Sequence, residues 1–396
     1  MDKKSRQIDI TYPLYIPALI AFLILVLPAT KFWFNSVGHR WVYVLLFSSL
    51  LTYLLVPLAQ LVAIKEMFLD LPDHARKLHM KGTPLLGGLS IFVSFIVSLA
   101  VNYIFSKELV GILIAVSLII IIGLLDVKFH LRAAYRLLVQ IAATAIVIYT
   151  GTVLTIFPSH TPLWYLNIPF TFLWILGLTN AMNFFDGMDG LAAGISVIIS
   201  TFIGILAYQN HQPFLGWTAI AIVGGCLGFL PYNLKLKGDA SIFLGDSGSN
   251  FLGFVLACMA INGDWSENSI VVSALAPVLI FSVLIYDMFY ITIDRYMTGK
   301  IHNFTEWVEY TGRDHLHHRL DALLHGKRKT VHFIFLLNIG LGCSALALRN
   351  ADTVDSIILV VQSVVFLTIV TILERIGNKI RLNGESQKNR HPENND

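Results

Sequence analysis

Long apolar runs separated by short polar stretches occupy almost the whole chain. Twelve runs are predicted to be membrane-spanning helices. They cover about residues 12–30, 41–63, 86–105, 109–126, 137–157, 164–182, 190–208, 214–233, 249–262, 268–290, 331–348 and 356–373. Only helices or closed barrels satisfy every backbone hydrogen bond in lipid, and these runs are too long and uniformly apolar for barrel strands. The pattern predicts an all-α polytopic membrane protein, with a single membrane domain at 1–376 and a polar, disordered cytoplasmic tail at 377–396.

The positive charges give this arrangement an orientation. With the N-terminus in the cytoplasm, all but four of the 28 Lys and Arg residues fall on the cytoplasmic side. The exceptions are Lys31, Arg40, Lys107 and Arg349. We therefore expect both termini in the cytoplasm and an N-terminal segment that acts as a signal anchor and is not cleaved.

Composition agrees with a membrane protein and excludes other classes. Charged residues make up 13% of the chain, against about 25% in an ordinary soluble domain. The net charge of +3 is too small to indicate a nucleic-acid partner. The three cysteines lie inside apolar runs, so they form neither a disulfide framework nor a metal-binding pattern.

Polar residues gather in five clusters, all on the predicted cytoplasmic side. The clusters lie at about residues 70–88, 126–140, 180–194, 233–249 and 312–320. The connections on the other side are short and plain. The clusters indicate a site on the cytoplasmic face that acts on a soluble substrate. The chain shows no internal repeat, which disfavours a transporter built from two inverted halves.

Four carboxylates at the ends of different predicted spans suggest chemistry on phosphates: Asp126, Asp186, Asp189 and Asp246. Carboxylate and amide oxygens suit Mg²⁺, which takes its other ligands from water and phosphate. Basic residues in the same clusters suit phosphate oxygens. These are Arg76, Lys77, Lys81, Arg136 and Arg319. The alternative is that the carboxylates belong to ordinary polar loops and the basic residues only anchor the chain at the membrane surface.

Two other patterns are weaker. The sequence Gly245-Asp246-Ser247-Gly248 resembles a serine-hydrolase motif, but the chain offers neither a β-barrel nor an α/β-hydrolase context. The histidines His315, His317 and His318 invite a zinc site, yet adjacent histidines cannot share a helix face. Hydrogen bonds from these histidines to a diphosphate or a sugar fit the pattern better.

Taken together, the five clusters resemble the motifs of polyprenyl-phosphate N-acetylhexosamine-1-phosphate transferases (glycosyltransferase 4 type). The resemblance runs over about residues 65–325. It rests on Arg76-Lys77-Leu78-His79 with Pro84 and Gly87-Gly88, on Asn180 to Gly190, on Phe243 to Ser249, and on His315-Leu316-His317-His318. The last segment is similar to that of bacterial undecaprenyl-phosphate GlcNAc-1-phosphate transferases and unlike the three-histidine run of the MurNAc-pentapeptide transferases.

The resemblance implies an enzyme of the bacterial cytoplasmic (inner) membrane. It would transfer an N-acetylhexosamine 1-phosphate, GlcNAc-1-phosphate by this pattern, from a UDP-sugar to undecaprenyl phosphate and release UMP. The product would begin a surface polysaccharide such as lipopolysaccharide, O-antigen or teichoic acid. The cofactor would be Mg²⁺, with Mn²⁺ as a substitute. The partners would be the UDP-N-acetylhexosamine, undecaprenyl phosphate and the bilayer, with a homodimer left open.

The resemblance also implies roles for individual residues. Asp246 and Asn183 would hold the metal, and Asp126, Asp186, Asp189 and Arg136 would form the catalytic group. Substrate-binding residues would be Arg76, Lys77, Lys81, Thr83, Asn180, Phe243, His315, His317, His318 and Arg319. Among these, Asp189, Phe243 and Thr83 would hold the uracil, and the histidines with Arg319 would contact the diphosphate or the sugar.

The sequence departs from the family pattern at several positions. Val127 stands where the family has a second aspartate after Asp126, Arg136 replaces a lysine, and Gly312 replaces an acidic residue. The first spans also add a crossing. A lipid phosphate with a second pKa near 6 is mostly dianionic at neutral pH and is itself a nucleophile. We therefore expect an active enzyme. Three alternatives remain: the same reaction with another N-acetylated UDP-sugar, a catalytically impaired relative that acts as a scaffold, and a cation transporter.

Overall fold

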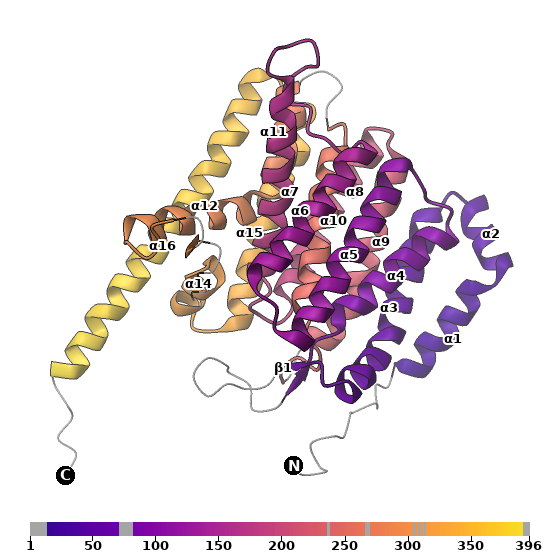
Figure 1. The fold of residues 1–396 in the computed structure, drawn as a ribbon, viewed down its shortest axis with the longest axis horizontal. Helices are drawn as coiled ribbons and strands as arrows, with labels where there is room; N and C mark the ends of the chain where they lie inside the picture. The colour runs from indigo at the N-terminus through magenta and orange to yellow at the C-terminus, as the bar shows by residue number, and fades with distance from the viewer. Residues whose placement is uncertain are drawn as a thin grey trace.

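The computed structural model describes residues 14–70, 82–235, 238–265, 270–303, 306–307, 310, 312 and 314–390. Among these residues almost all regular structure is helical (Figure 1). The helices are α1 (Tyr15–Val26), α2 (Pro28–Ser36), α3 (Arg40–Lys65), α4 (Gly87–Val101), α5 (Lys107–Phe129), α6 (Ala133–Thr150), η2 (Trp164–Leu166), α7 (Asn167–Phe184), α8 (Leu191–Gln209), α9 (Pro213–Asn233), α10 (Gly245–Asn262), α11 (Ile270–Ile280), α12 (Ser282–Met297), α14 (Leu316–Leu324), α15 (Lys327–Leu348) and α16 (Thr353–Arg390). The strands are β1 (Leu69–Asp70) and β2 (Thr83–Pro84).

The helix α10 lies at the centre of the bundle. It contacts α4, α5, α7 and α8 and is buried along nearly its whole length. Small residues in its first turns allow the neighbouring helices to approach closely. A Cβ atom added at Gly88 of α4 would lie only 2.1 Å from the Cα atom of Gly248 in α10. The start of α10, which carries Asp246, is therefore held directly against the start of α4.

The number of membrane crossings differs from the sequence prediction. Among the described residues, seven helices are long and apolar enough to cross a membrane, or up to nine if two bent pairs each count as one span. The twelve predicted spans are not confirmed, because α4, α7 and α10 do not qualify. At 1.5 Å per residue, the 15 residues of α4 reach about 22 Å, short of a hydrocarbon core of about 30 Å. The enclosed helix α10 needs no lipid-facing surface and is correspondingly more polar.

Two breaks divide predicted spans. The helices α1 and α2 meet at 72° and α11 and α12 at 77°. Pro28 begins α2, and the preceding Leu27 is extended, as a residue before proline prefers. The span predicted for 268–290 is bent between α11, which contains Pro277, and α12, which carries Asp287 and continues to Met297. The bend turns this polar helix away from the direction of α11.

The last helix continues beyond the predicted membrane domain. The sequence predicts a disordered tail from residue 377, whereas the backbone of α16 is helical to Arg390. A helix that is already nucleated adds residues at little cost, because each further residue also adds a hydrogen bond. Polar composition alone therefore does not end this helix.

A short strand pair connects the loops at one end of the bundle (Figure 1). Asp70 pairs with Thr83, and the Phe243 N–H donates to the Pro84 carbonyl at 2.8 Å. The Gly87 N–H in turn donates to the Phe243 carbonyl at 3.0 Å. These bonds align the segments before α4 and α10. They bring two of the predicted polar clusters together.

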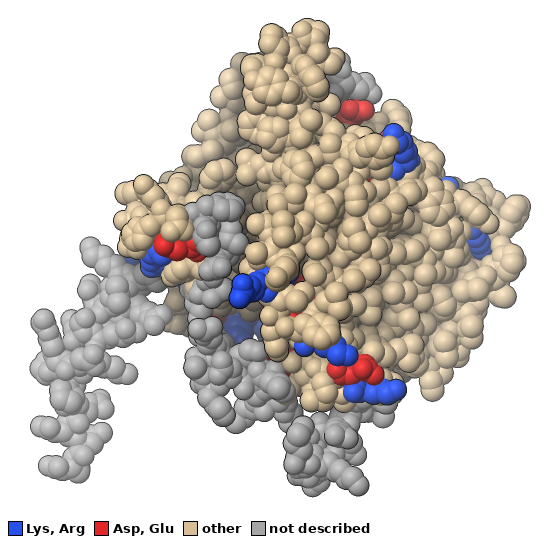
Figure 2. Space-filling model, in the orientation of Figure 1, with Lys and Arg blue, Asp and Glu red and all other residues tan. Residues whose placement is uncertain are grey.

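Charged side chains are unevenly distributed on the surface. Among the described residues, most of the face seen in Figure 2 carries no charged side chain, and the charges visible there lie mainly towards its lower part. Helices that meet lipid need such an uncharged band. Multiple apolar helices and this band together define a multi-pass membrane protein.

Candidate active site

A cavity of about 1000 Å³ lies at the end of the bundle that carries β1. All five predicted polar clusters contribute to its wall. Its lining includes Asp70, Leu85, Asp126, Val127, Lys128, His130, Asp186, Gly187, Met188, Asp189, Asn233, Phe243, Gly245, Asp246 and His318. The convergence expected from the sequence is therefore present, and six of the predicted site residues line one cavity: Asp126, Asp186, Asp189, Phe243, Asp246 and His318.

An arginine joins two of the carboxylates. Arg136, in the first turns of α6, donates from Nη1 to Asp246 Oδ2 at 2.8 Å. The same nitrogen lies 3.2 Å from Asp126 Oδ2 at the end of α5. Arg136 therefore forms ion pairs with both Asp126 and Asp246. The side chain of Asp246 remains 48% exposed, so it can still reach a ligand in the cavity.

Amide side chains fix the helices behind these carboxylates. Gln140 donates to Asn250 Oδ1 at 3.1 Å, and Asn180 donates to Gln140 Oε1 at 3.0 Å. Asn183 donates to Ser249 at 2.9 Å, so α6, α7 and α10 are joined by polar contacts. This hydrogen bond uses the amide nitrogen of Asn183 and not its Oδ1 atom, which is the atom by which an amide binds a cation. Neither Asn180 nor Asn183 lines the cavity itself.

The loop between α7 and α8 presents two more carboxylates. Burial raises the pKa of Asp186 well above its usual value, and the nearby charges of Asp246 and Asp189 raise this pKa further. Asp189 accepts a hydrogen bond from the Ala240 N–H at 3.1 Å. Three carboxylates close enough to repel one another disfavour full ionisation unless a cation is present.

The histidine segment is anchored outside the cavity. His315 Nδ1 lies 2.8 Å from Asp287 Oδ2, and its ring stacks on Phe184 with centroids 4.6 Å apart. Arg319 pairs with Glu374 of α16 at 2.9 Å and lies over the ring of Tyr290. Of the four predicted substrate contacts in this segment, only His318 lines the cavity.

His317 supports the loop that carries Asp186. Its ring is buried, and neither ring nitrogen has a hydrogen-bond partner among the described residues. The ring packs against Phe185, and a Cβ atom added at Gly187 would lie 2.4 Å from its Nε2 atom. Burial and three neighbouring positive groups lower the pKa of His317 well below its usual value. The neutral ring of His317 therefore packs against the loop that carries Asp186.

The remaining predicted residues divide into two groups. Arg76, Lys77 and Lys81 lie outside the described residues. Thr83 is buried in β2 and does not line the cavity. Their predicted roles in substrate binding stay predictions.

Sequence reasoning missed Asp287 and Glu374, which hold His315 and Arg319. Both were hidden at or inside predicted spans. A lone carboxylate in an otherwise apolar run was the available signal, because such residues are costly in a membrane and mark functional or paired sites. Arg295, which makes a bidentate pair with Asp314 at 2.7 and 2.8 Å, was also missed.

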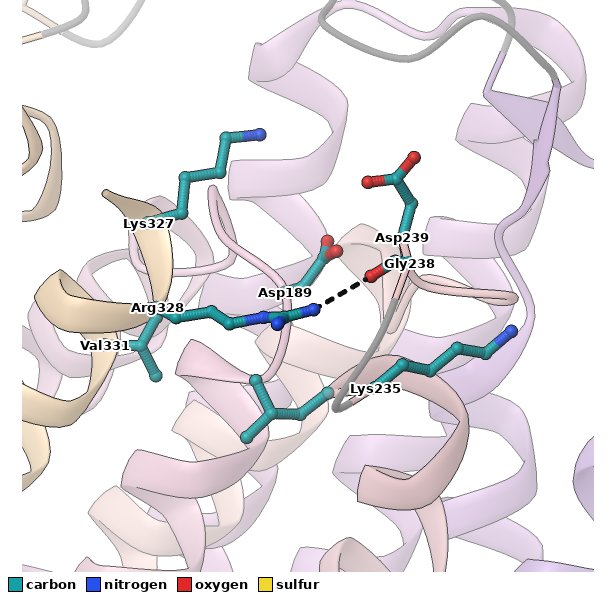
Figure 3. Close-up of a pocket in the computed structure, with 8 residues that line it drawn as sticks. Asp189, Lys235, Gly238, Asp239, Lys327, Arg328 and Val331 are labelled. Carbon is teal, nitrogen blue, oxygen red and sulfur yellow. Dashed lines mark hydrogen bonds between the residues drawn. The ribbon is translucent and has the colours of Figure 1, made fainter. Parts of the chain in front are cut away.

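A smaller pocket of about 110 Å³ adjoins the cavity and shares Asp189 and Lys327 with it (Figure 3). Lys235 and Arg328 add positive charge to its wall, and Arg328 donates to the Gly238 carbonyl at 3.2 Å. Asp189 therefore belongs both to this pocket, which also contains Asp239, and to the larger cavity with the other carboxylates. The combined space can accept an elongated ligand that carries negative charge.

The side chains of the cavity limit which metal ion could bind there. Among the described residues, no group of three or more His, Cys, Asp or Glu side chains is placed to hold a metal ion. Mg²⁺ differs from zinc here, since one or two carboxylates with waters and substrate phosphates suffice. Asp246 and Asp186 are the side chains that fit this need, because their mutual repulsion would be relieved by a cation.

The fold and the cavity define a class: a multi-pass membrane enzyme with an acidic site at the ends of its helices. Residues 109–264 match the family model described as glycosyl transferase family 4. The chain is 30% identical over 338 residues to a probable undecaprenyl-phosphate N-acetylglucosaminyl 1-phosphate transferase of Bacillus subtilis, with 84% of this chain and 91% of the relative covered. The chain therefore belongs to glycosyl transferase family 4 and is a transferase.

Two further relatives show the breadth of this similarity. A decaprenyl-phosphate N-acetylglucosaminephosphotransferase of Mycobacterium tuberculosis is 30% identical, with 66% of this chain and 71% of the relative covered. A phospho-N-acetylmuramoyl-pentapeptide-transferase of Staphylococcus haemolyticus is 32% identical, with 54% and 73% covered. Each of these names combines a sugar with a transferred phosphate.

Proposed function

We propose that the protein transfers an N-acetylhexosamine 1-phosphate from a UDP-sugar to undecaprenyl phosphate and releases UMP. The sugar we favour is GlcNAc, because the B. subtilis relative that covers most of the chain carries that name. The product would start a lipid-linked surface polysaccharide. The site would face the cytoplasm, where UDP-sugars are made, with both termini on the same side.

The observation that carries this proposal is the pair of carboxylates Asp126 and Asp246 in the cavity wall, which are joined by ion pairs to Arg136. Arg136 is a fixed cation between two carboxylates, and Asp186 and Asp189 complete the acidic wall. Such a group can neutralise and align phosphates in a site at the membrane surface. The lipid acceptor and the soluble donor can meet only at such a surface.

In the proposed reaction an oxygen of the lipid phosphate attacks the sugar-linked phosphorus of the donor. The bond to the nucleotide's α-phosphate oxygen breaks, and UMP leaves with the bonding electrons. Asp246 and Asp186, with Asn183, would hold Mg²⁺, which when bound would offset the charge between donor and acceptor. Arg136 would hold a phosphate oxygen, while Asp126 fixes the position of Arg136. Phe243 and Asp189 would hold the uracil.

The test is release of UMP by the purified protein in detergent. Undecaprenyl phosphate and Mg²⁺ would be supplied with UDP-GlcNAc, UDP-GalNAc or UDP-MurNAc-pentapeptide in separate reactions, with EDTA as the control. Release that depends on lipid and Mg²⁺ with one donor supports the proposal and identifies the sugar. Folded protein that releases no UMP with any of the three contradicts it.

The raised pKa of Asp186 gives a pH-dependent prediction. A carboxyl whose pKa is raised stays protonated to a higher pH than usual, so the apparent affinity for Mg²⁺ should increase as the pH rises through that pKa. Asp189→Asn removes one of the charges that raise this pKa. The rise of Mg²⁺ affinity with pH, which is the acidic limb of the profile, should therefore move to lower pH. Mg²⁺ titrations of activity at a series of pH values would measure the limb. A limb that stays in place would contradict the assignment of Asp186 to the cation.

Val127 provides a further prediction. It lines the cavity beside Asp126, whose ion pair with Arg136 already places a positive charge at this wall. Because the nucleophile supplies its own charge, the reaction needs no proton acceptor at position 127. We expect Val127→Asp to leave kcat within about threefold of wild type or to raise it, since outer residues tune and do not create activity. A loss beyond about tenfold would show that the site depends on valine.

A further inference from the structure

Asp287 is a fully buried carboxylate that none of the roles described above uses. It lies in α12, shortly after the 77° bend. Its Oδ2 atom is 2.8 Å from His315 Nδ1, and its Oδ1 atom accepts the Leu316 N–H at 2.7 Å. The Leu316 N–H opens α14 and would otherwise lack a partner, as the first N–H groups of a helix do. One carboxylate therefore caps α14 and holds the histidine before it.

The charged groups near Asp287 make their closest ion pairs with other residues. Arg319 of α14 lies 3.7 Å from its Oδ1 atom but makes its closer pair with Glu374 of α16 at 2.9 Å. On α12 itself, Arg295 is engaged by Asp314. A buried carboxylate is costly unless its oxygens are satisfied. The close contacts of Asp287 are both with the start of the histidine segment.

This geometry determines which nitrogen of His315 carries a proton. A carboxylate only accepts hydrogen bonds, so Nδ1 must be the protonated atom whether the ring is neutral or charged. In a neutral His315 ring, Nε2 is then the atom that accepts a hydrogen bond. The ring is also fixed in angle by its stacking on Phe184, two residues before Asp186.

We propose that Asp287 is a positioning residue for the transfer reaction, which fixes the Nδ1–H form of His315 and the first turn of α14. That turn places His318 in the cavity wall. The inference rests on the proposed function, because it assigns the histidine segment to the phosphates or the sugar of the donor. Asp287 itself touches no substrate and acts through His315.

The variant that tests the proposal is Asp287→Asn. An asparagine in the same place can still accept the Leu316 N–H with Oδ1, so the cap on α14 remains. Its amide group then faces His315 as a donor and favours the other tautomer, with the proton on Nε2. We expect kcat to fall by about 10- to 100-fold, the range seen when the residue orienting a functional histidine is lost. The KM for the donor should change by less than about threefold.

A double-mutant cycle separates positioning from general stabilisation. If Asp287 acts through His315, Asp287→Asn should cause no further loss of kcat in a His315→Ala background. Asp294→Asn, on the same helix and paired only loosely with Lys300 at 3.9 Å, is the matched control and should keep wild-type kcat. Wild-type kcat in Asp287→Asn, or an equal loss in both backgrounds, would overturn the proposal.

A spectroscopic measurement on the unmodified protein keeps the proposal testable if Asp287→Asn does not fold. In protein labelled with ¹⁵N-histidine, the signal that disappears in His315→Ala should show a protonated Nδ1. A signal with the proton on Nε2 alone would refute the role of Asp287. This result does not depend on turnover, so it stands apart from a failure of wild-type protein to release UMP.

Discussion

Asp246→Asn should reduce UMP release by about a thousandfold or more, the loss expected when charge stabilisation at a reacting phosphate is removed. Asp246 is the half-exposed carboxylate that accepts from Arg136 and faces Asp186 across the cavity. Its loss would remove one of the proposed metal ligands and leave Arg136 paired with Asp126 alone. Initial rates at saturating donor and Mg²⁺ would measure the effect.

The protein should remain folded in this variant. Asp246 lies in the first turn of α10, where a negative charge contributes only about 0.3–1 kcal/mol through the helix dipole. Asp264→Asn, just beyond the other end of the same helix, is the matched control, since its described hydrogen bonds are made by its backbone. Full activity of Asp246→Asn, or an equal loss in Asp264→Asn, would contradict the metal-site assignment.

Gly88→Ala should prevent normal folding or lower the thermal midpoint by well over 5 °C. The added Cβ atom would lie 2.1 Å from the Cα atom of Gly248, a backbone position that no rotamer change can relieve. Overpacking of even flexible side chains costs about 1–3 kcal/mol, and a clash of two backbones should exceed that range. The thermal midpoint would be measured in detergent, from the fraction of monodisperse protein that remains on size exclusion after heating.

The control for this glycine is Gly177→Ala. Gly177 lies within α7, and a Cβ atom added there meets nothing within 4 Å. Alanine is favoured over glycine within a helix by about 1 kcal/mol, so this variant should be neutral or slightly more stable. A Gly88→Ala protein as stable as Gly177→Ala would show that α4 and α10 are not in contact as described.

The sequence predicted well what hydropathy and motif spacing govern. Helical runs alternate with polar loops, so their existence and the grouping of Asp126, Asp186 and Asp246 at one end could be read from the pattern. Hydropathy could not reveal the bend between α11 and α12, because a broken apolar run looks the same as a straight one. It also overcounted spans, because the enclosed helix α10 and the 15-residue helix α4 both fall in runs that were counted as membrane crossings.

The site was predicted less completely than the fold. Motif residues lining the cavity were found because several carboxylates in one protein are conspicuous. Two residues that hold the histidine segment were missed, because Asp287 lies inside one predicted span and Glu374 directly after another, and their partners are distant in sequence. Arg319 forms an ion pair with Glu374 of α16 and does not line the cavity. Its position depends on how three helices pack, which the sequence pattern does not show.

The ion pair between Arg319 and Glu374 determines the order in which parts of the protein can form their contacts during translation. Asp126, Arg136 and Asp246 are all translated well before α16, so the acidic wall can assemble while the ribosome is still at work. The histidine segment receives its last ion pair only after residue 374 has emerged. A nascent chain would thus lack the anchor of Arg319 until Glu374 of α16 has been synthesised.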